Sequence, residues 1–220
     1  MLMIPVTALR PGATPMVSLS LTPELAHGND RAVYRHPAEA GRCIKVPRFP
    51  DRGSHQNERE KSYFEGLKRR GVHDWRYVPE YFGTVTTDLG EGLVFGLVTD
   101  ADGSLSLNIR QFQQRGDADW LSTQAFVDEL ERLYRYLRDN WIVPSDINDR
   151  NVVCQRRADG SIRLWLIDGV SNPDFMPLAN VWPWFARQKI DRRMQRFYRR
   201  LHEYGFISRA QRDSLLASLS

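Results

Sequence analysis

The chain has 220 residues, 41% of them hydrophobic and 26% charged, which is the composition of an ordinary soluble globular protein. Its formal net charge is +4, but seven Lys and Arg residues against one Asp give the segment from Arg187 to Arg200 a charge of +6 and leave −2 for the rest. No apolar run approaches the roughly 20 residues of a membrane span, the N-terminus lacks a signal-peptide pattern, and Cys43 and Cys154 lie in apolar strand patterns typical of buried free thiols. We therefore expect a cytoplasmic protein without a transmembrane segment.

Short strand patterns dominate the first hundred residues, after a Pro-rich start. Turns are expected at 28–30, 37–41 and 88–92, where Gly, Pro, Asn and Asp cluster. A polar loop over 47–56 should precede a helix that begins near Asn57, a favourable N-cap residue, and ends at Arg70 before Gly71. The expected strands are 17–21, 32–35, 43–46, 81–86 and 93–99.

Helical patterns take over after residue 100. One long helix carries an apolar face, and a polar loop over 142–151 follows it. A hairpin of strands 152–155 and 162–167 comes next, and the chain ends in a basic helix with a second apolar face. The two apolar faces are formed by Phe126, Leu130, Leu133 and Leu137, and by Ile190, Met194, Phe197, Leu201 and Tyr204. This order predicts an α+β protein with two lobes, a β-rich lobe over residues 1–100 and a helical lobe over 101–220.

The polar loop and the second hairpin strand hold three residues suited to phosphoryl transfer. Asp146 is followed five positions on by Asn151, and Asp168 ends an apolar strand 17 residues after that. One carboxylate can orient an acceptor hydroxyl, while an amide and a second carboxylate can hold the magnesium ions that bridge nucleotide phosphates. Taken singly, these residues also suit turns that cap their own backbone. A calcium loop is a further alternative, but the glycine and closing glutamate of an EF-hand are absent.

Lys45 lies inside an apolar strand, so its ammonium must reach solvent or meet a carboxylate. It either belongs to an edge strand with one wet face or grips phosphates while a glutamate holds it in place. Glu60 is the glutamate we choose, because Tyr63, Phe64 and Leu67 follow it at helical spacing and share its inward face. A surface position on an amphipathic helix is the alternative for Glu60.

With these residues in their order, the chain resembles the protein-kinase-like superfamily, and most closely the PhoP-regulatory-network YrbL family, from about residue 17 to 204. The resembling stretches are 28–34, 43–46, 57–60, 78–83, 146–151 and 167–169. The resemblance implies a bilobal fold, in which an antiparallel β lobe and a reduced helical lobe hold ATP and Mg²⁺ between them, at the seam near residues 98–103. It also implies that Lys45 binds phosphates and pairs with Glu60, that Asp146 is the catalytic base, and that Asn151 and Asp168 hold magnesium.

Several positions depart from the kinase pattern. Counted back from Val33, a kinase glycine loop has Gly at 26, 28 and 31, and only Gly28 is present here, beside Ala26 and Arg31. Gly28, Arg31 and Val33 remain nucleotide-binding candidates, with Arg31 supplying charge. Pro144-Ser145 replaces the His-Arg that precedes the catalytic Asp, and Gly169-Val170 follows Asp168 in place of Phe-Gly. The short remainder of the chain favours a small or unusual acceptor.

The expected function is therefore ATP- and Mg²⁺-dependent transfer of the γ-phosphoryl group to a hydroxyl of an unknown acceptor. The main alternative is a nucleotide-binding pseudokinase that acts as a regulatory module, and a third is a basic adaptor whose function lies in its tail. The Arg187–Arg200 segment is either a solvated helix face or a surface for an anionic ligand or membrane, with Trp182-Pro183-Trp184-Phe185 beside it. No nucleic-acid-binding motif accompanies it, so no specific nucleic acid is predicted.

Overall fold

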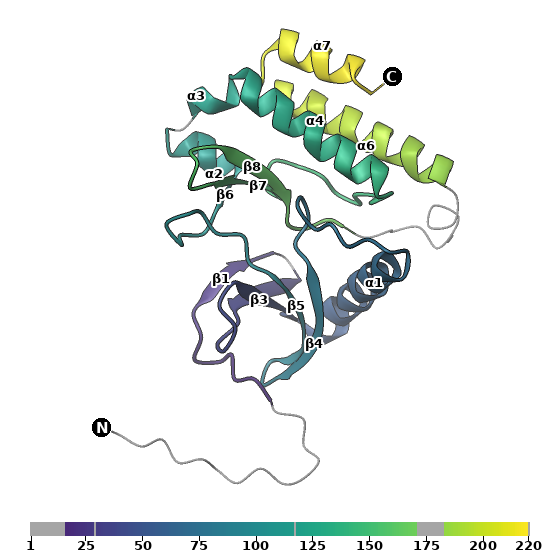
Figure 1. The fold of residues 1–220 in the computed structure, drawn as a ribbon. Coiled ribbons are helices and arrows are strands. Elements are labelled where there is room, and N and C mark those ends of the chain that lie inside the picture. The colour runs from purple at the N-terminus through teal and green to yellow at the C-terminus, as the bar shows by residue number, and fades with distance from the viewer. Residues whose placement is uncertain (1–15, 29, 117, 171–182, 220) are drawn as a thin grey trace.

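The structure, a computed structural model, describes residues 16–28, 30–116, 118–170 and 183–219, arranged in two lobes (Figure 1). The first lobe is a five-stranded antiparallel sheet in the order β1-β2-β3-β5-β4, with one helix packed against it. Its elements are β1 (Glu24–His27), β2 (Arg31–Arg35), β3 (Arg42–Pro47), α1 (Pro50–Arg69), β4 (Tyr81–Thr87) and β5 (Gly90–Gly96).

The second lobe contains a small antiparallel sheet, β6-β7-β8, which Figure 1 shows between the helices of this lobe and the first lobe. Its elements are β6 (Leu107–Asn108), α2 (Ile109–Gln114), α3 (Ala118–Leu121), α4 (Gln124–Asp139), β7 (Val152–Arg156), β8 (Ile162–Leu166), α6 (Pro183–Glu203) and α7 (Arg209–Ala217). The predicted α+β organisation, a β-rich lobe followed by a helical one, is confirmed.

The strand expected at 17–21 is absent, and the first strand is β1 instead. Val17 makes a single bridge to Thr87. Beyond it, the carboxylate of Asp88 accepts hydrogen bonds from the backbone N–H of Leu19 at 2.6 Å and of Ser20 at 3.1 Å. The segment therefore bonds to a side chain rather than to a neighbouring strand, which its apolar pattern could not reveal.

Helix α1 begins at Pro50, seven residues before the predicted start at Asn57. Proline suits the first helical position because its fixed φ fits the helix and its missing N–H would have no intrahelical partner there. Asn57 is buried within the helix, and its side-chain Nδ2 donates to the carbonyl of Glu91 at 3.2 Å. The predicted cap is thus a link between α1 and β5.

Strand β5 begins at Gly90 and ends at Gly96, three residues earlier at each end than the predicted 93–99. The glycines of 88–92 suggested a long turn, but Thr87 already pairs with Gly90, so only two residues turn the chain. Gly92 is needed inside the strand because a Cβ there would lie 2.4 Å from a side-chain carbon of Ile44. In a sequence, a glycine required by a close approach cannot be told from a glycine that belongs to a turn.

The hydrophobic core runs through both lobes and fixes the elements that position the polar residues of interest. In the first lobe, the ring of Phe64 on α1 packs edge-on against Phe95 of β5, with ring centroids 5.0 Å apart. The preceding residue on α1, Tyr63, accepts a hydrogen bond at its hydroxyl from the backbone N–H of Val143 at 2.7 Å. Helix α1 is thereby tied to the loop that follows α4.

The apolar faces predicted for the long helices are buried in α4 and α6, with one error. Tyr204 lies beyond the end of α6 and is 54% exposed, while Tyr198, which the spacing did not select, is fully buried. Both Cys43 and Cys154 are buried free thiols, as predicted. Among the described residues, no helix is long and apolar enough to cross a membrane.

Candidate active site

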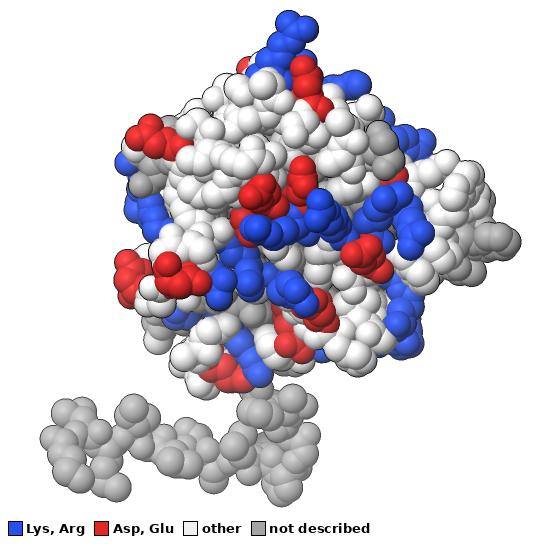
Figure 2. All heavy atoms as spheres, turned by 45° about the horizontal axis from the view of Figure 1, so that its top comes forward, with Lys and Arg blue, Asp and Glu red and all other residues white. Residues whose placement is uncertain are grey.

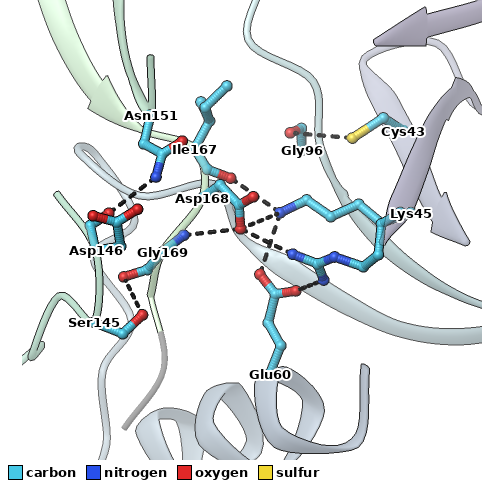
Figure 3. Close-up of polar contacts among 11 residues, drawn as sticks. Cys43, Lys45, Glu60, Gly96, Ser145, Asp146, Asn151, Ile167, Asp168 and Gly169 are labelled. Carbon is cyan, nitrogen blue, oxygen red and sulfur yellow. Dashed lines mark hydrogen bonds and ion pairs between the residues drawn. The ribbon is translucent and has the colours of Figure 1, made fainter. Parts of the chain in front are cut away.

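Five of the residues selected from the sequence meet where the two lobes face each other (Figure 3). Lys45 comes from β3 and Glu60 from α1, whereas Asp146, Asn151 and Asp168 come from the loops before β7 and after β8. A cavity opens at this place. It is lined by Arg31, Gln56, Glu60, Ser145, Asp146, Asn151, Asp168, Gly169 and Val170.

Lys45 and Glu60 form a buried ion pair, with Nζ 3.2 Å from Oε1. Nζ also donates to the carbonyl oxygen of Ile167 at 3.0 Å and lies 3.8 Å from Oδ1 of Asp168 (Figure 3). Strand β3 lies between β2 and β5, so the edge-strand alternative for Lys45 is wrong. The surface alternative for Glu60 is wrong as well, because this residue is 4% exposed.

Arg31, at the start of β2, is a second buried cation in the same place. Its guanidinium bonds to Oε2 of Glu60 through Nη1 and to Oδ1 of Asp168 through Nη2, the latter at 2.9 Å. Burial opposes the charge on Arg31, but Glu60 and Asp168 outweigh it and raise its pKa. The charge that the sequence assigned to Arg31 is therefore present at the site, although its partners there are carboxylates.

Asp168 accepts hydrogen bonds at Oδ1 from Arg31 and from the backbone N–H of Gly169, the latter at 2.8 Å. Burial works against its charge, but the neighbouring Lys45 and Arg31 prevail and hold the pKa of the carboxyl below its usual value. The side chain is 45% exposed, on the side of the cavity. Asp168 is thus an ionised carboxylate accessible to a ligand.

The loop from Asp146 to Asn151 is held by its own side chains. Oδ1 of Asn148 accepts from the backbone N–H groups of Arg150 and Asn151, at 2.9 and 3.1 Å. The turn-capping function suspected for this motif therefore belongs to Asn148. Its Nδ2 donates to Oδ2 of Asp146 at 2.8 Å, and Nδ2 of Asn151 donates to the carbonyl of Asp146 at 3.0 Å. The Asp146 carboxylate is oriented and exposed at the cavity.

Gly169 joins this loop to the segment after β8. Its carbonyl accepts from the backbone N–H of Ser145 at 2.7 Å and of Asp146 at 3.3 Å, and from the Ser145 hydroxyl at 2.9 Å. It has a positive φ of +72°, and a Cβ built on it would lie 2.1 Å from the carbonyl oxygen of Asp146. Only glycine fits this contact. Nothing in the sequence indicated this contact between Gly169 and Asp146.

Two other predicted nucleotide-binding residues stand apart from the cavity. Gly28 closes the turn before β2 through a backbone hydrogen bond to Arg31 at 2.9 Å, and Val33 pairs with Lys45 across β2 and β3. Neither lines the cavity. Their proposed nucleotide contacts stay predictions.

Sequence reasoning missed a supporting ion pair behind the loop. Asp149 is buried, and its Oδ2 lies 2.6 Å from Nε of Arg110 on α2. Asp149 lies between the two residues selected by their spacing, Asp146 and Asn151. Its partner Arg110 is 39 residues away in the sequence, so no local pattern predicts the pair. The pair anchors the middle of the loop to the second lobe.

A magnesium ion was predicted at Asn151 and Asp168. The described residues contain no group of three or more His, Cys, Asp or Glu that could hold a metal unaided. Magnesium bound with a nucleotide needs fewer protein ligands, typically one or two side-chain oxygens completed by water and phosphate. Within the described part of the chain, Asp168 Oδ2 has no hydrogen-bond partner, and Asn151 engages its Nδ2 while its Oδ1 has none. The donor set therefore fits magnesium bound together with phosphates.

A lysine–glutamate pair in a β lobe that faces an Asp, an Asn and a second Asp in a helical lobe defines a kinase-like protein. A crystallised kinase domain, PF14_0431, shares this fold with a TM-score of 0.50 at 13% sequence identity. The match covers 78% of this chain, which spans about three fifths (61%) of that kinase domain.

The chain belongs to the family described as PhoP regulatory network protein YrbL, whose model matches residues 17–202. The YrbL proteins of Escherichia coli (strain K12) and Shigella flexneri are each 34% identical to it over 185 residues. Each alignment covers 83% of this chain and 86% of the relative. The kinase-like fold and the YrbL family, both inferred from the motifs, are confirmed.

Proposed function

We propose that this protein binds ATP with magnesium and transfers the γ-phosphoryl group to a hydroxyl of a small or unusual acceptor. The observation that carries the proposal is the convergence of five residues from distant parts of the chain: Glu60, Asp146, Asn151 and Asp168 line one cavity, and Lys45, which does not line it, contacts Glu60 and Asp168. Phosphoryl transfer depends mainly on positioning and charge stabilisation, which this set supplies.

Each residue has a distinct part in the proposed reaction. Lys45, held by Glu60, would bind the α- and β-phosphates. Asp168 and Asn151 would hold magnesium, which when bound neutralises charge that develops on the phosphates. Asp146, oriented by Asn148, would accept the hydrogen bond of the acceptor hydroxyl and align its oxygen with the γ-phosphorus.

The test is ADP release by purified protein supplied with ATP, Mg²⁺ and a panel of sugars, nucleosides, peptides and lipids, with mass spectrometry for autophosphorylation. Asp168→Ala and Asp146→Asn should each lower turnover by at least about 100-fold, the usual effect of removing a group that acts in the transition state. Asp159→Asn, in the exposed turn between β7 and β8, is the matched control and should leave turnover unchanged. Turnover that is the same in Asp168→Ala as in the natural protein would refute catalysis at this site.

The pseudokinase alternative predicts a different pair of results. It is favoured by the departures of the glycine loop from the kinase pattern, since only Gly28 of three glycines is present. A thermal shift with ATP and Mg²⁺ that Lys45→Met abolishes, together with no phosphate transfer to any acceptor or to the protein, would establish a nucleotide-binding regulatory module.

The arginine-rich face of α6 supports a second and separate proposal, that it contacts an anionic membrane surface. Within the described residues, the six arginines of the basic segment make no ion pair; they are Arg187, Arg192, Arg193, Arg196, Arg199 and Arg200. Trp184 and Phe185, 59% and 43% exposed, extend this helix with aromatic surface suited to lipid headgroups. Figure 2 shows acidic side chains among the basic ones on the face it presents, so a membrane would meet a surface of mixed charge there.

Co-sedimentation with lipid vesicles tests this second proposal. The protein should co-sediment with phosphatidylserine vesicles but not with phosphatidylcholine vesicles, and the triple variant Arg192→Glu, Arg196→Glu, Arg199→Glu should lose that binding. Each arginine near an anionic surface contributes about 1 kcal/mol of binding free energy, so replacing three of them should lower the affinity for the vesicles by two or more orders of magnitude. Equal sedimentation of the variant would refute the proposal.

A further inference from the structure

We propose that Arg31 is a latch on the nucleotide-free site: it occupies Asp168 until a polyphosphate draws it away, so that a divalent metal binds tightly only together with nucleotide. This inference rests on the proposed nucleotide function and concerns the regulation of that site.

The contacts of Arg31 join the two lobes. Through one guanidinium it bonds to Glu60 in the first lobe and to Oδ1 of Asp168 in the second, with the Asp168 contact at 2.9 Å. Lys45 reaches the same two carboxylates, at 3.2 and 3.8 Å. The first-lobe cations thus hold the carboxylate that is predicted to bind metal.

The four side chains form a charge-balanced cluster. Arg31 and Lys45 contribute two positive charges, and Glu60 and Asp168 contribute two negative ones. Asp146 also lines the cavity, but its carboxylate bonds to Asn148 and not to the cluster. A partly buried cluster that is already neutral gains little from another cation, because each carboxylate has its counter-charge.

A metal ion alone would upset this balance. Bound at Asp168, it would bring a double positive charge next to a guanidinium that lies 2.9 Å from the same carboxylate. Repulsion between the cations at such short range is strong in a partly buried site. Free metal at Oδ2 of Asp168 would therefore bind weakly beside Arg31, or would displace Arg31 from Oδ1; among the described residues, the side-chain partners of Arg31 are the carboxylates of Glu60 and Asp168, so displacement would cost it one of them.

A polyphosphate removes the conflict, because it offers Arg31 a new partner. The guanidinium lines the same cavity as Asp168 and Asn151, so phosphates bound with the metal lie within its reach. Arginine binds phosphate in the same forked geometry that it uses for carboxylates. The backbone of Arg31 is fixed by its pairing with Pro47, so the change is a swing of the side chain.

Arg31 stands at a position where a kinase glycine loop has a glycine. A glycine there would let backbone amides approach the phosphates, whereas an arginine supplies a movable charge and couples nucleotide binding to metal binding. The coupling is reciprocal, so metal should also strengthen nucleotide binding.

The experiment measures Mn²⁺ binding to the full chain by the loss of the free-ion electron paramagnetic resonance signal, with and without a non-hydrolysable ATP analogue. Arg31→Gln should bind Mn²⁺ alone about 10- to 100-fold more tightly than the natural protein, which corresponds to releasing one charge-assisted hydrogen bond from Asp168. Arg35→Gln, at the exposed far end of the same strand, removes an equal charge outside the cluster and should bind like the natural protein.

Two outcomes separate failure of the latch from failure of the proposed function. If the natural protein and Arg31→Gln bind Mn²⁺ alone equally, and both bind it with the analogue, the latch is wrong and the nucleotide site stands. If neither binds Mn²⁺ even with the analogue, the proposed function fails and the latch with it.

Arg31→Lys keeps the test decisive should Arg31→Gln fold poorly. It retains the charge but cannot bond to Glu60 and Asp168 with one forked group, so its affinity for Mn²⁺ alone should lie between those of the other two proteins. An affinity equal to that of the natural protein would overturn the latch.

Discussion

Replacing Gly169 by alanine should both destabilise the protein and inactivate it. A residue with a Cβ pays about 1–2 kcal/mol in the left-handed conformation that Gly169 adopts at φ +72°. The new Cβ would also lie 2.1 Å from the carbonyl oxygen of Asp146, far inside van der Waals contact. The loop must retreat, which weakens the three hydrogen bonds that Gly169 O accepts from Ser145 and Asp146, each worth about 0.5–1.5 kcal/mol.

The expected total is a loss of about 3–5 kcal/mol in the free energy of unfolding, from the conformational penalty and two or more weakened hydrogen bonds. Gly160→Ala is the matched control, because Gly160 has a similar φ of +77° with nothing within 4 Å of the new Cβ. It should cost only about 1–2 kcal/mol and leave ADP release unchanged.

Urea unfolding of the three proteins measures both costs. A Gly169→Ala protein that is no less stable than Gly160→Ala, or that turns over ATP normally, would refute the close contact between Gly169 and the Asp146 loop.

Three further predictions concern the buried charges and thiols. Glu60→Gln should lower the free energy of unfolding by about 3–5 kcal/mol, because Asp168 is then the one carboxylate of the cluster left for Lys45 and Arg31. Lys45→Met should cost roughly half as much, because Arg31 still neutralises Glu60. Equal urea midpoints for the two variants would contradict this prediction. The pKa of Asp168 is lower in the folded protein than in the unfolded chain, so its contribution to stability is complete above the unfolded pKa of about 3.9 and is lost as the pH falls through the folded value. Asp168→Asn should therefore flatten the decline of the unfolding free energy below about pH 4, and an unchanged decline would count against the prediction. Burial raises the pKa of the Cys43 thiol to about 11, so native protein at pH 8 should resist thiol reagents until urea unfolds it, and rapid labelling in the native state would show the burial to be wrong.

The sequence could predict the site because its residues follow from local rules. A lysine amid apolar strand residues must reach solvent or meet a carboxylate, and helical spacing selects Glu60 over its neighbours as the carboxylate that it meets. The ends of strands and helices were less predictable. Pro50 begins α1 earlier than the better N-cap residue Asn57, and Asp88 replaces a strand partner for the segment near Leu19. Both depend on contacts between distant residues.

The two main departures from the kinase pattern meet at one carboxylate. Arg31 replaces a glycine of the phosphate loop, Gly169 replaces the phenylalanine after the metal-binding aspartate, and both bond to Oδ1 of Asp168. Read along the sequence, each change looks like the loss of a kinase feature and favours a degenerate, inactive relative. In space they form a single arrangement, in which Gly169 allows the Asp146 loop to pack closely and Arg31 neutralises the carboxylate that this packing leaves beside the cavity. A site that had merely decayed would have no reason to keep the buried charges of Arg31, Lys45 and Glu60 beside Asp168, because buried ion pairs can often be replaced by apolar residues without loss of stability. The departures therefore favour the proposed phosphoryl-transfer site, with Arg31 as its proposed latch, over the pseudokinase alternative.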